Sequence, residues 1–244
     1  MGKVKIKKKD TRIDMTAMSD VTVLLLTFFM LTSTFLTKEP VTVITPPSVS
    51  VEKVPDQNLL SVLISPTGKV FLAVTGSKDS TFKSETVRAD LLKNMASKYN
   101  ALHPEAKISF TNKEIEAFAK TGAFGVPFRY LKEWLDIEDI TLRDKVLEGE
   151  EPLSTKDGKK VMLAGIPINM NEDPNNPNEF QMWVQAAYNS MNEELKTSIV
   201  KGKGIAIKAD QTTPYSVVNI VMDNLQTIKM NKFSLMTALK AEEE

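Results

Sequence analysis

The longest apolar run of the chain lies near its N-terminus, at residues 21–36, and reads VTVLLLTFFMLTSTFL. As a helix it would reach about 24 Å, whereas the hydrocarbon core of a bilayer is about 30 Å thick and needs about twenty residues. Lys38, Glu39 and Pro40 follow the run and stop its extension. The missing turn must therefore come from the N-terminal side, and the pattern predicts a transmembrane helix over residues 15–36.

One carboxylate falls inside this predicted helix. Asp20 lies about five residues, or about 7 Å, within the cytoplasmic edge of the hydrocarbon. A carboxylate there costs on the order of 2.5–3.5 kcal/mol, so it usually faces a partner or a wet cavity. At about 100° per residue, four polar residues share an arc of about 40°: Thr16, Asp20, Thr27 and Thr34. This stripe predicts a polar partner, unless the threonines bond to their own helix and Asp20 is interfacial.

Residues 37–57 are predicted to form an extended linker, because prolines at positions 40, 46, 47 and 55 oppose helix formation. Alternating segments within it can add to the edge of a sheet, or the linker can stay unpaired. A hairpin follows, with strands at 59–64 and 69–74 around the turn Ser65-Pro66-Thr67-Gly68.

Beyond the hairpin, the pattern alternates between helical and strand periodicity. Helices are predicted at 81–100, after a capping box formed by Thr111 and Glu114, at 128–135 and at 180–200. The end of the chain predicts a strand at 204–209, a helix that Thr213 caps with Pro214 in its first position, and a strand at 233–237. Residues 58–244 should therefore form a two-layer α+β domain, a mixed sheet with helices on one face.

Charge gives the orientation of the predicted helix. The chain has 31 basic and 31 acidic residues, and residues 1–14 hold six of the bases against two acids. This basic tail should remain in the cytoplasm and residues 37–244 should be exported. A cleaved signal peptide has a similar layout, but the apolar run is long, Asp20 interrupts it and no small-residue cleavage site follows it.

A search for catalytic or metal-binding patterns gives little. The chain has no cysteine and a single histidine, His103, in a turn-like Leu-His-Pro context. The acids at 136, 138, 139, 148, 150 and 151 lack calcium-loop spacing and indicate a solvated face. Asp210 ends a strand before a helix, where α/β enzymes often place an acid, but it has no evident partner and a turn is the simpler interpretation. Neither an enzymatic function nor a cofactor, a metal or a nucleic acid is expected.

Two blocks of sequence resemble the ExbD/TolR family of biopolymer transport proteins. The first is IDMTAMSDVTVLLLTFFMLT at residues 13–32, and the second runs from IAIKAD at 205–210 through PY and VMD to FSLMT at 233–237. The likeness covers about residues 10–75 and 200–238 and is closer to ExbD than to TolR. Ala17 stands where the family usually has proline, and residues from about 100 to 178 exceed the usual length, as an insertion would.

The resemblance implies a motor subunit of the inner membrane of a Gram-negative cell. Such proteins place a homodimer of single helices inside a pentameric ring of multi-pass ExbB-like subunits in the lipid bilayer. Asp20 matches their protonatable aspartate, and proton flow would drive a TonB-like protein that opens outer-membrane transporters. Two alternatives remain: a TolR-type subunit for envelope integrity, and a membrane-tethered periplasmic binding module in which Asp20 has no proton role.

Overall fold

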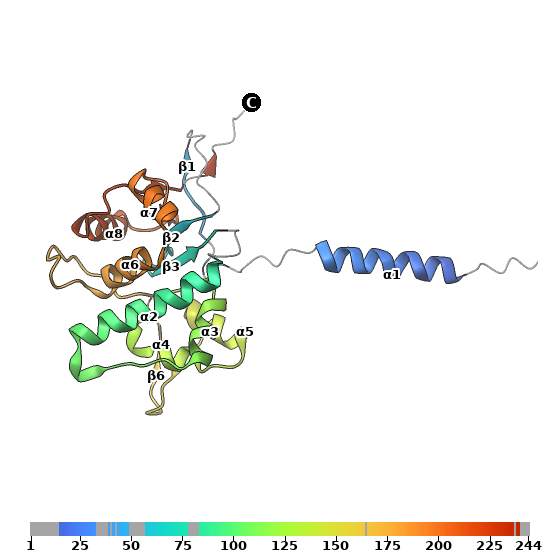
Figure 1. The fold of residues 1–244 in the computed structure, drawn as a ribbon, viewed down its shortest axis with the longest axis horizontal. Helices are drawn as coiled ribbons and strands as arrows, with labels where there is room; N and C mark the ends of the chain where they lie inside the picture. Colours follow the sequence, from blue (N-terminus) through green and yellow to red (C-terminus); the bar gives the residue numbers. More distant parts are fainter. Residues whose placement is uncertain are drawn as a thin grey trace, which may run out of the picture. The chain divides into compact units, whose positions relative to one another are not determined.

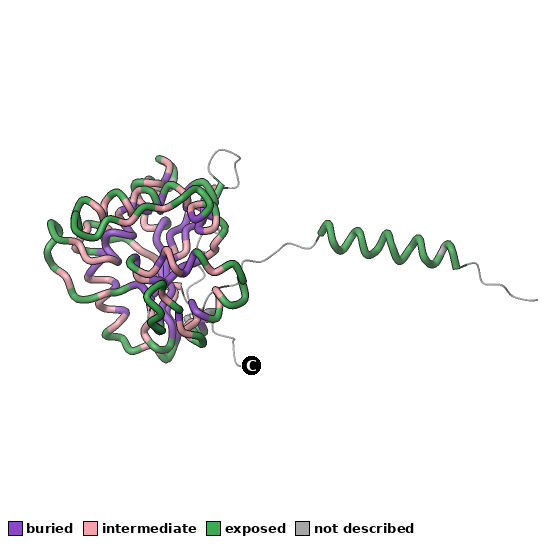
Figure 2. The backbone as a smooth tube through the Cα atoms, turned by 90° about the horizontal axis from the view of Figure 1, so that it is seen from below, coloured by how far each residue is buried: buried purple, intermediate pink, exposed green. Residues whose placement is uncertain are grey.

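The computed structural model describes residues 15–32, 39, 41, 43–48, 57–77, 83–163, 165–236 and 238–239. It divides into two compact units, Met1–Thr37 and Lys38–Glu244. The first contains α1 (Met15–Thr32), and every side chain described on this helix is exposed (Figure 2). Within the described residues, no helix combines the length and the apolar character that crossing a membrane requires. The predicted basic tail and the predicted end of the span at 33–36 lie outside the described residues.

The second unit contains a mixed five-stranded sheet with the order β4-β3-β2-β7-β8 (Figure 1). Its strands are β2 (Leu59–Ile64), β3 (Val70–Thr75), β4 (Ala123–Phe124), β7 (Ile205–Ala209) and β8 (Ser234–Leu235). The predicted hairpin is confirmed, since β2 and β3 pair antiparallel, with Ile64 opposite Val70. The predicted C-terminal strands are confirmed: β7 pairs in parallel with β2, and β8 pairs in parallel with β7, although β8 is shorter than expected.

One face of the three central strands is continuously apolar. Strand neighbours on this face form three rows of buried side chains: Leu60, Val74 and Ile205; Val62, Leu72 and Ile207; and Ile64, Val70 and Ala209. On the opposite face Phe71 is also fully buried, because the chain at Gly125 lies directly against its ring. A Cβ on Gly125 would stand 2.1 Å from Cδ1 of Phe71, so only a glycine permits this close approach. The sheet is therefore buried on both faces near its centre.

The helices of the second unit are α2 (Ser84–Leu102), α3 (Asn112–Lys120), α4 (Phe128–Leu135), α5 (Ile140–Glu148), α6 (Glu179–Ser190), α7 (Glu193–Val200) and α8 (Tyr215–Thr227). Helices α2, α3, α4 and α8 lie close to the predicted positions, whereas α5 was not predicted. The Thr111 capping box is confirmed, with the Thr111 hydroxyl accepting the N–H of Glu114. Helices α2 and α6 run side by side (Figure 1). The domain is a mixed α+β domain, and the arrangement of its helices on a single sheet face stays a prediction.

Two predictions about these helices are wrong. The single helix expected at 180–200 is two helices, α6 and α7, because Met191 takes an extended conformation between them. The apolar periodicity continues across this break, and a periodicity argument cannot see it. The last long helix begins one residue later than expected, with Pro214 as its cap. The hydroxyl of Thr213 instead donates to the carbonyl of Ser65, 3.0 Å away, and joins this end of α8 to the β2–β3 turn.

The predicted insertion at about 100–178 contributes to the sheet and to the core. It holds a short 3₁₀ helix (Pro104–Ala106), α3, β4, α4, α5 and a small hairpin of β5 (Leu153–Ser154) and β6 (Lys160–Val161). Strand β4 extends the main sheet beside β3. Phe118 stacks on Trp183 of α6 at a ring centroid distance of 5.9 Å, and the tilted ring of Phe124 packs against Trp183 at 4.7 Å. The sequence pattern did not predict this β5–β6 hairpin.

Part of the predicted linker contacts the second unit. β1 (Pro47–Ser48) pairs in parallel with β9 (Ala238–Leu239), close to the C-terminus. Val43 is buried, and Glu39 forms an ion pair of 2.6 Å with Lys208 of β7. The described linker residues are therefore held by the chain's own domain, and the segments between them lie outside the described residues.

Candidate functional site

The predicted polar stripe lies on α1. Three of its residues, Thr16, Asp20 and Thr27, belong to this helix, and all three side chains are exposed. The spacing of seven residues between Asp20 and Thr27 corresponds to about two turns, or about 10 Å along the helix. Thr34 lies outside the described residues. Because α1 is helical over these positions, the three side chains lie along one side of the helix, as their spacing predicts.

The threonine hydroxyls of α1 bond back to their own helix. Thr27 donates to the carbonyl of Leu24 at 2.9 Å, Thr22 to Met18 at 2.7 Å and Thr32 to Phe28 at 2.8 Å. For Thr27 this is the alternative that the sequence left open, since its only hydroxyl proton is already used. Such bonds let a polar side chain enter an apolar medium without an unsatisfied donor. Asp20 is then the residue of the stripe with a group that can gain and lose a proton.

Apart from Ser19, Thr22 and Thr32, the rest of the described surface of α1 is apolar. Large side chains stand well exposed along the whole helix, from Met15 at 70% to Leu31 at 87%. An exposed apolar surface of this extent marks a contact with lipid or with another protein. The described helix therefore presents one carboxylate within a largely apolar surface.

Residues 7–117 match the family model described as biopolymer transport protein ExbD/TolR. This match supports an ExbD/TolR-type biopolymer transport protein. The match contains α1 with Asp20, the linker, the β2–β3 hairpin, α2 and most of α3. The second block of resemblance, at 205–237, lies outside the matched residues and stays a prediction. Neither a curated protein nor a solved structure matches the chain.

Asp210 has a structural role in this ExbD/TolR-type protein. It directly follows β7 and is buried. Its carboxylate accepts hydrogen bonds from the hydroxyl of Thr212 at 2.6 Å and from the backbone N–H of Thr212 at 2.9 Å. It also accepts the N–H of Ile44 in the linker at 2.8 Å, while the N–H of Gln211 donates to the carbonyl of Ile44. The hydroxyl of Thr212 and these backbone donors lower the pKa of Asp210. The turn interpretation is confirmed, and the sequence did not reveal the bond to the linker.

His103 follows the end of α2, as the Leu-His-Pro context suggested. Its exposed ring stacks on Tyr99 at a centroid distance of 4.4 Å, and Nδ1 lies 3.2 Å from the carbonyl of Tyr99. Among the described residues, no group of three or more histidine, aspartate or glutamate side chains is placed to hold a metal ion. Of the acids in the predicted solvated face, Asp139 caps α5 and Asp136 pairs with Lys156 at 3.2 Å.

Two polar features of the core were missed by the sequence argument. Arg88 is buried on α2 and donates to the carbonyls of Val74, Ala119 and Thr121, which ties α2 to β3 and to the end of α3. Burial lowers the pKa of Arg88. Its position one turn before Leu92 on the apolar face was the available signal. The second feature is a network of buried amides that joins α6 to α8, in which Asn178 donates to Asn224 at 2.6 Å.

Proposed function

We propose that this chain is the proton-driven subunit of an ExbB–ExbD-type motor, with Asp20 taking up and releasing protons within the membrane. The family match over α1 supports this proposal, because it covers the segment that carries the carboxylate. The motor would act on a TonB-like protein and so energise transport across the outer membrane. Biopolymer transport is the function of the matched family, and the specific client is part of the proposal.

The proposal places residues 15–36 across the inner membrane of a Gram-negative cell, with residues 1–14 in the cytoplasm and residues 37–244 in the periplasm. The described part of α1 has 18 residues, which span about 27 Å at the usual rise. Four further residues would bring the helix to the thickness of the hydrocarbon core. The basic tail supports this orientation, since positive charge is retained on the cytoplasmic side.

Asp20 supplies the chemistry through its two protonation states. In hydrocarbon the neutral carboxyl is favoured, because the charged form loses its hydration. A charged Asp20 would therefore turn toward polar groups of a surrounding ring, and a neutral one could face an apolar wall. A proton that crosses a potential of about 100 mV releases about 2.3 kcal/mol, which is enough to bias one orientation over the other. Each protonation cycle would then move the helix by one step.

The partners follow from this mechanism. A single helix cannot enclose a proton path, so the proposal needs further subunits around α1. The family resemblance implies that these are a pentameric ring of ExbB-like subunits around a homodimer of this chain. The exposed apolar side chains of α1 fit such a ring and the lipid around it. No cofactor is required, because the carboxylate itself carries the proton.

The test is Asp20→Asn in cells that carry the native partners. The amide keeps the size and polarity of the side chain but cannot exchange a proton, so energised uptake through outer-membrane transporters should be lost. Asp157→Asn is the matched control, because Asp157 is exposed at the β5–β6 turn. Both variants must reach the membrane in equal amounts. Full uptake by the Asp20→Asn cells would exclude the proton role.

A TolR-type motor for envelope integrity uses the same chemistry with another client. Co-purification of the native chain with a TonB-like or a TolA-like protein separates these two functions. The other alternative is a tethered binding module. The predicted insertion favours it, because the helices and strands between α2 and α6 could form a binding surface that a membrane anchor does not require.

A further inference from the structure

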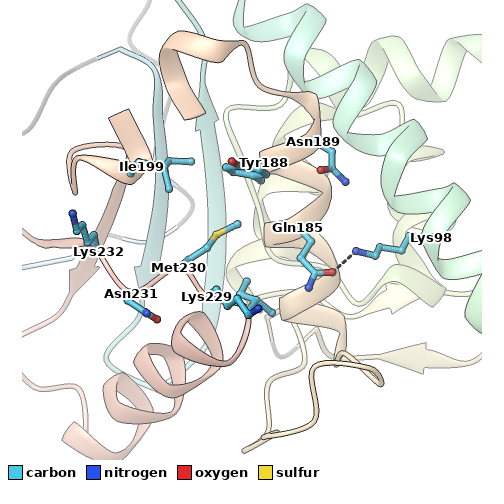
Figure 3. A pocket seen from close by; sticks show the side chains of 11 residues that line it. Lys98, Gln185, Tyr188, Asn189, Ile199, Lys229, Met230, Asn231 and Lys232 are labelled. Atoms are coloured by element: carbon cyan, nitrogen blue, oxygen red, sulfur yellow. Dashed lines mark hydrogen bonds between the residues drawn. The ribbon is translucent and has the colours of Figure 1, made fainter. Parts of the chain in front are cut away.

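A pocket of about 530 Å³ opens beside α6, α7 and the turn between α8 and β8. Figure 3 shows Lys98 of α2 reaching toward α6 from one side, with Lys229 and Lys232 of the α8–β8 turn across from it. Tyr188 and Met230 form an apolar part of the wall. The remaining lining residues are uncharged, so the described lining carries three lysines and no carboxylate.

Among the described residues, these lysines differ from Lys196 nearby in having no carboxylate within ion-pair distance. Lys196 on α7 pairs with Glu193 at 2.8 Å and lies over the ring of Tyr188. Within the part of the chain that the structure describes, no ion pair involves Lys98, Lys229 or Lys232. Lys98 instead donates to the amide oxygen of Gln185, and burial lowers its pKa. Like charges in the lining of one pocket repel each other, and a bound anion reduces this repulsion.

The backbone conformation of Lys229 is also unusual for a residue with a side chain. Lys229 has a φ of 64°, a left-handed conformation that a residue with a side chain adopts at a cost. A glycine is the usual residue at such a position after a helix, so a lysine here is not explained by the turn itself. Strained positions of this kind are often found where a side chain has a binding role.

We propose that this pocket binds a small anion that carries two or more carboxylate or phosphate groups. Its volume lies within the range of about 300–1,000 Å³ that is typical of small-molecule sites. Two acidic groups can each meet a lysine, while the amides of Gln185 and Asn231 offer hydrogen bonds to the polar groups between them. This site is separate from Asp20 and does not depend on the motor function.

The test is titration of the purified full-length chain in neutral detergent with citrate and with pyrophosphate, followed by calorimetry. Binding of either anion supports the proposal, and the stronger of the two identifies the acidic group that the pocket prefers. Lys229→Gln combined with Lys232→Gln should weaken binding by at least about tenfold, since it removes two of the three positive charges in the lining. The matched control combines Lys107→Gln and Lys160→Gln, two exposed lysines outside the lining.

A second variant separates a loss of binding from a loss of folding. Lys229→Gly relieves the left-handed strain, so its melting temperature should equal or exceed that of the unchanged chain while anion binding weakens. Two results would overturn the proposal: no heat of binding from either anion at 10 mM, or equal weakening in the control pair. Asp20→Asn should bind both anions as the unchanged chain does, which keeps this test independent of the motor.

Discussion

Glu179 is the first residue of α6, and its side chain moves from water to a largely buried site when the chain folds. Its carboxylate accepts the N–H of Phe128 at 2.7 Å, and burial raises its pKa from 4.5 to about 7. The folded chain therefore binds this proton more tightly than the unfolded chain does. The stability that Glu179 contributes is fully present below about pH 4.5 and is lost as the pH rises to about 7.

Glu179→Gln should remove this part of the pH dependence. The amide oxygen can still accept the N–H of Phe128, and no charge is left to bury. We expect the variant to be more stable than the unchanged chain at pH 8, by at most about 3 kcal/mol, and close to it at pH 4.5. Urea unfolding of the full chain, followed by tryptophan fluorescence at several pH values, measures this. The exposed Glu172→Gln is the control, and equal pH slopes in both variants would contradict the prediction.

Which residues could be predicted depends on whether their surroundings are local in sequence. Asp20 could be found because the apolar run that surrounds it is contiguous, and the match over residues 7–117 covers it. Glu179 and Arg88 could not, because α4, β3 and α3 bury them from distant parts of the chain. The lysine pocket is similar, since it joins residues 98, 185 and 229 from three elements.

At the scale of elements, Arg88 joins α2 by hydrogen bonds to β3 and to the end of α3. Its guanidinium satisfies carbonyls of β3 and of the chain at the end of α3, so its loss leaves three carbonyl groups without this donor. Arg88→Met should cost about 3 kcal/mol of unfolding free energy, because buried acceptors would lose their partners. Hydrogen exchange of the full chain should show faster exchange at α3 and β4. Arg129→Met, an exposed arginine of α4, should change neither measurement.

The boundaries of the elements were predictable where caps and turns are local. The hairpin at residues 59–75, the Thr111 capping box and α4 follow directly from adjacent residues. The break between α6 and α7 could not be predicted in this way, because the apolar spacing continues through Met191. The pairing of β1 with β9 joins residues nearly two hundred positions apart, and only the folded domain brings them together. The sequence could suggest that the linker adds to a sheet edge, but it could not identify the partner strand.

For the whole molecule, the open question is whether α1 works as a moving part or as an anchor. Replacing residues 15–36 by an unrelated apolar helix without an acid distinguishes the two functions. A tethered binding module would keep its activity, since its domain and its attachment to the membrane are unchanged. A motor would lose energised uptake completely, because no group remains to exchange protons with the ring.

Restoring a single aspartate at position 20 of the foreign helix tests the carboxylate alone. Partial recovery of uptake is expected, as the carboxylate returns at the right depth while the surface that contacts the ring does not.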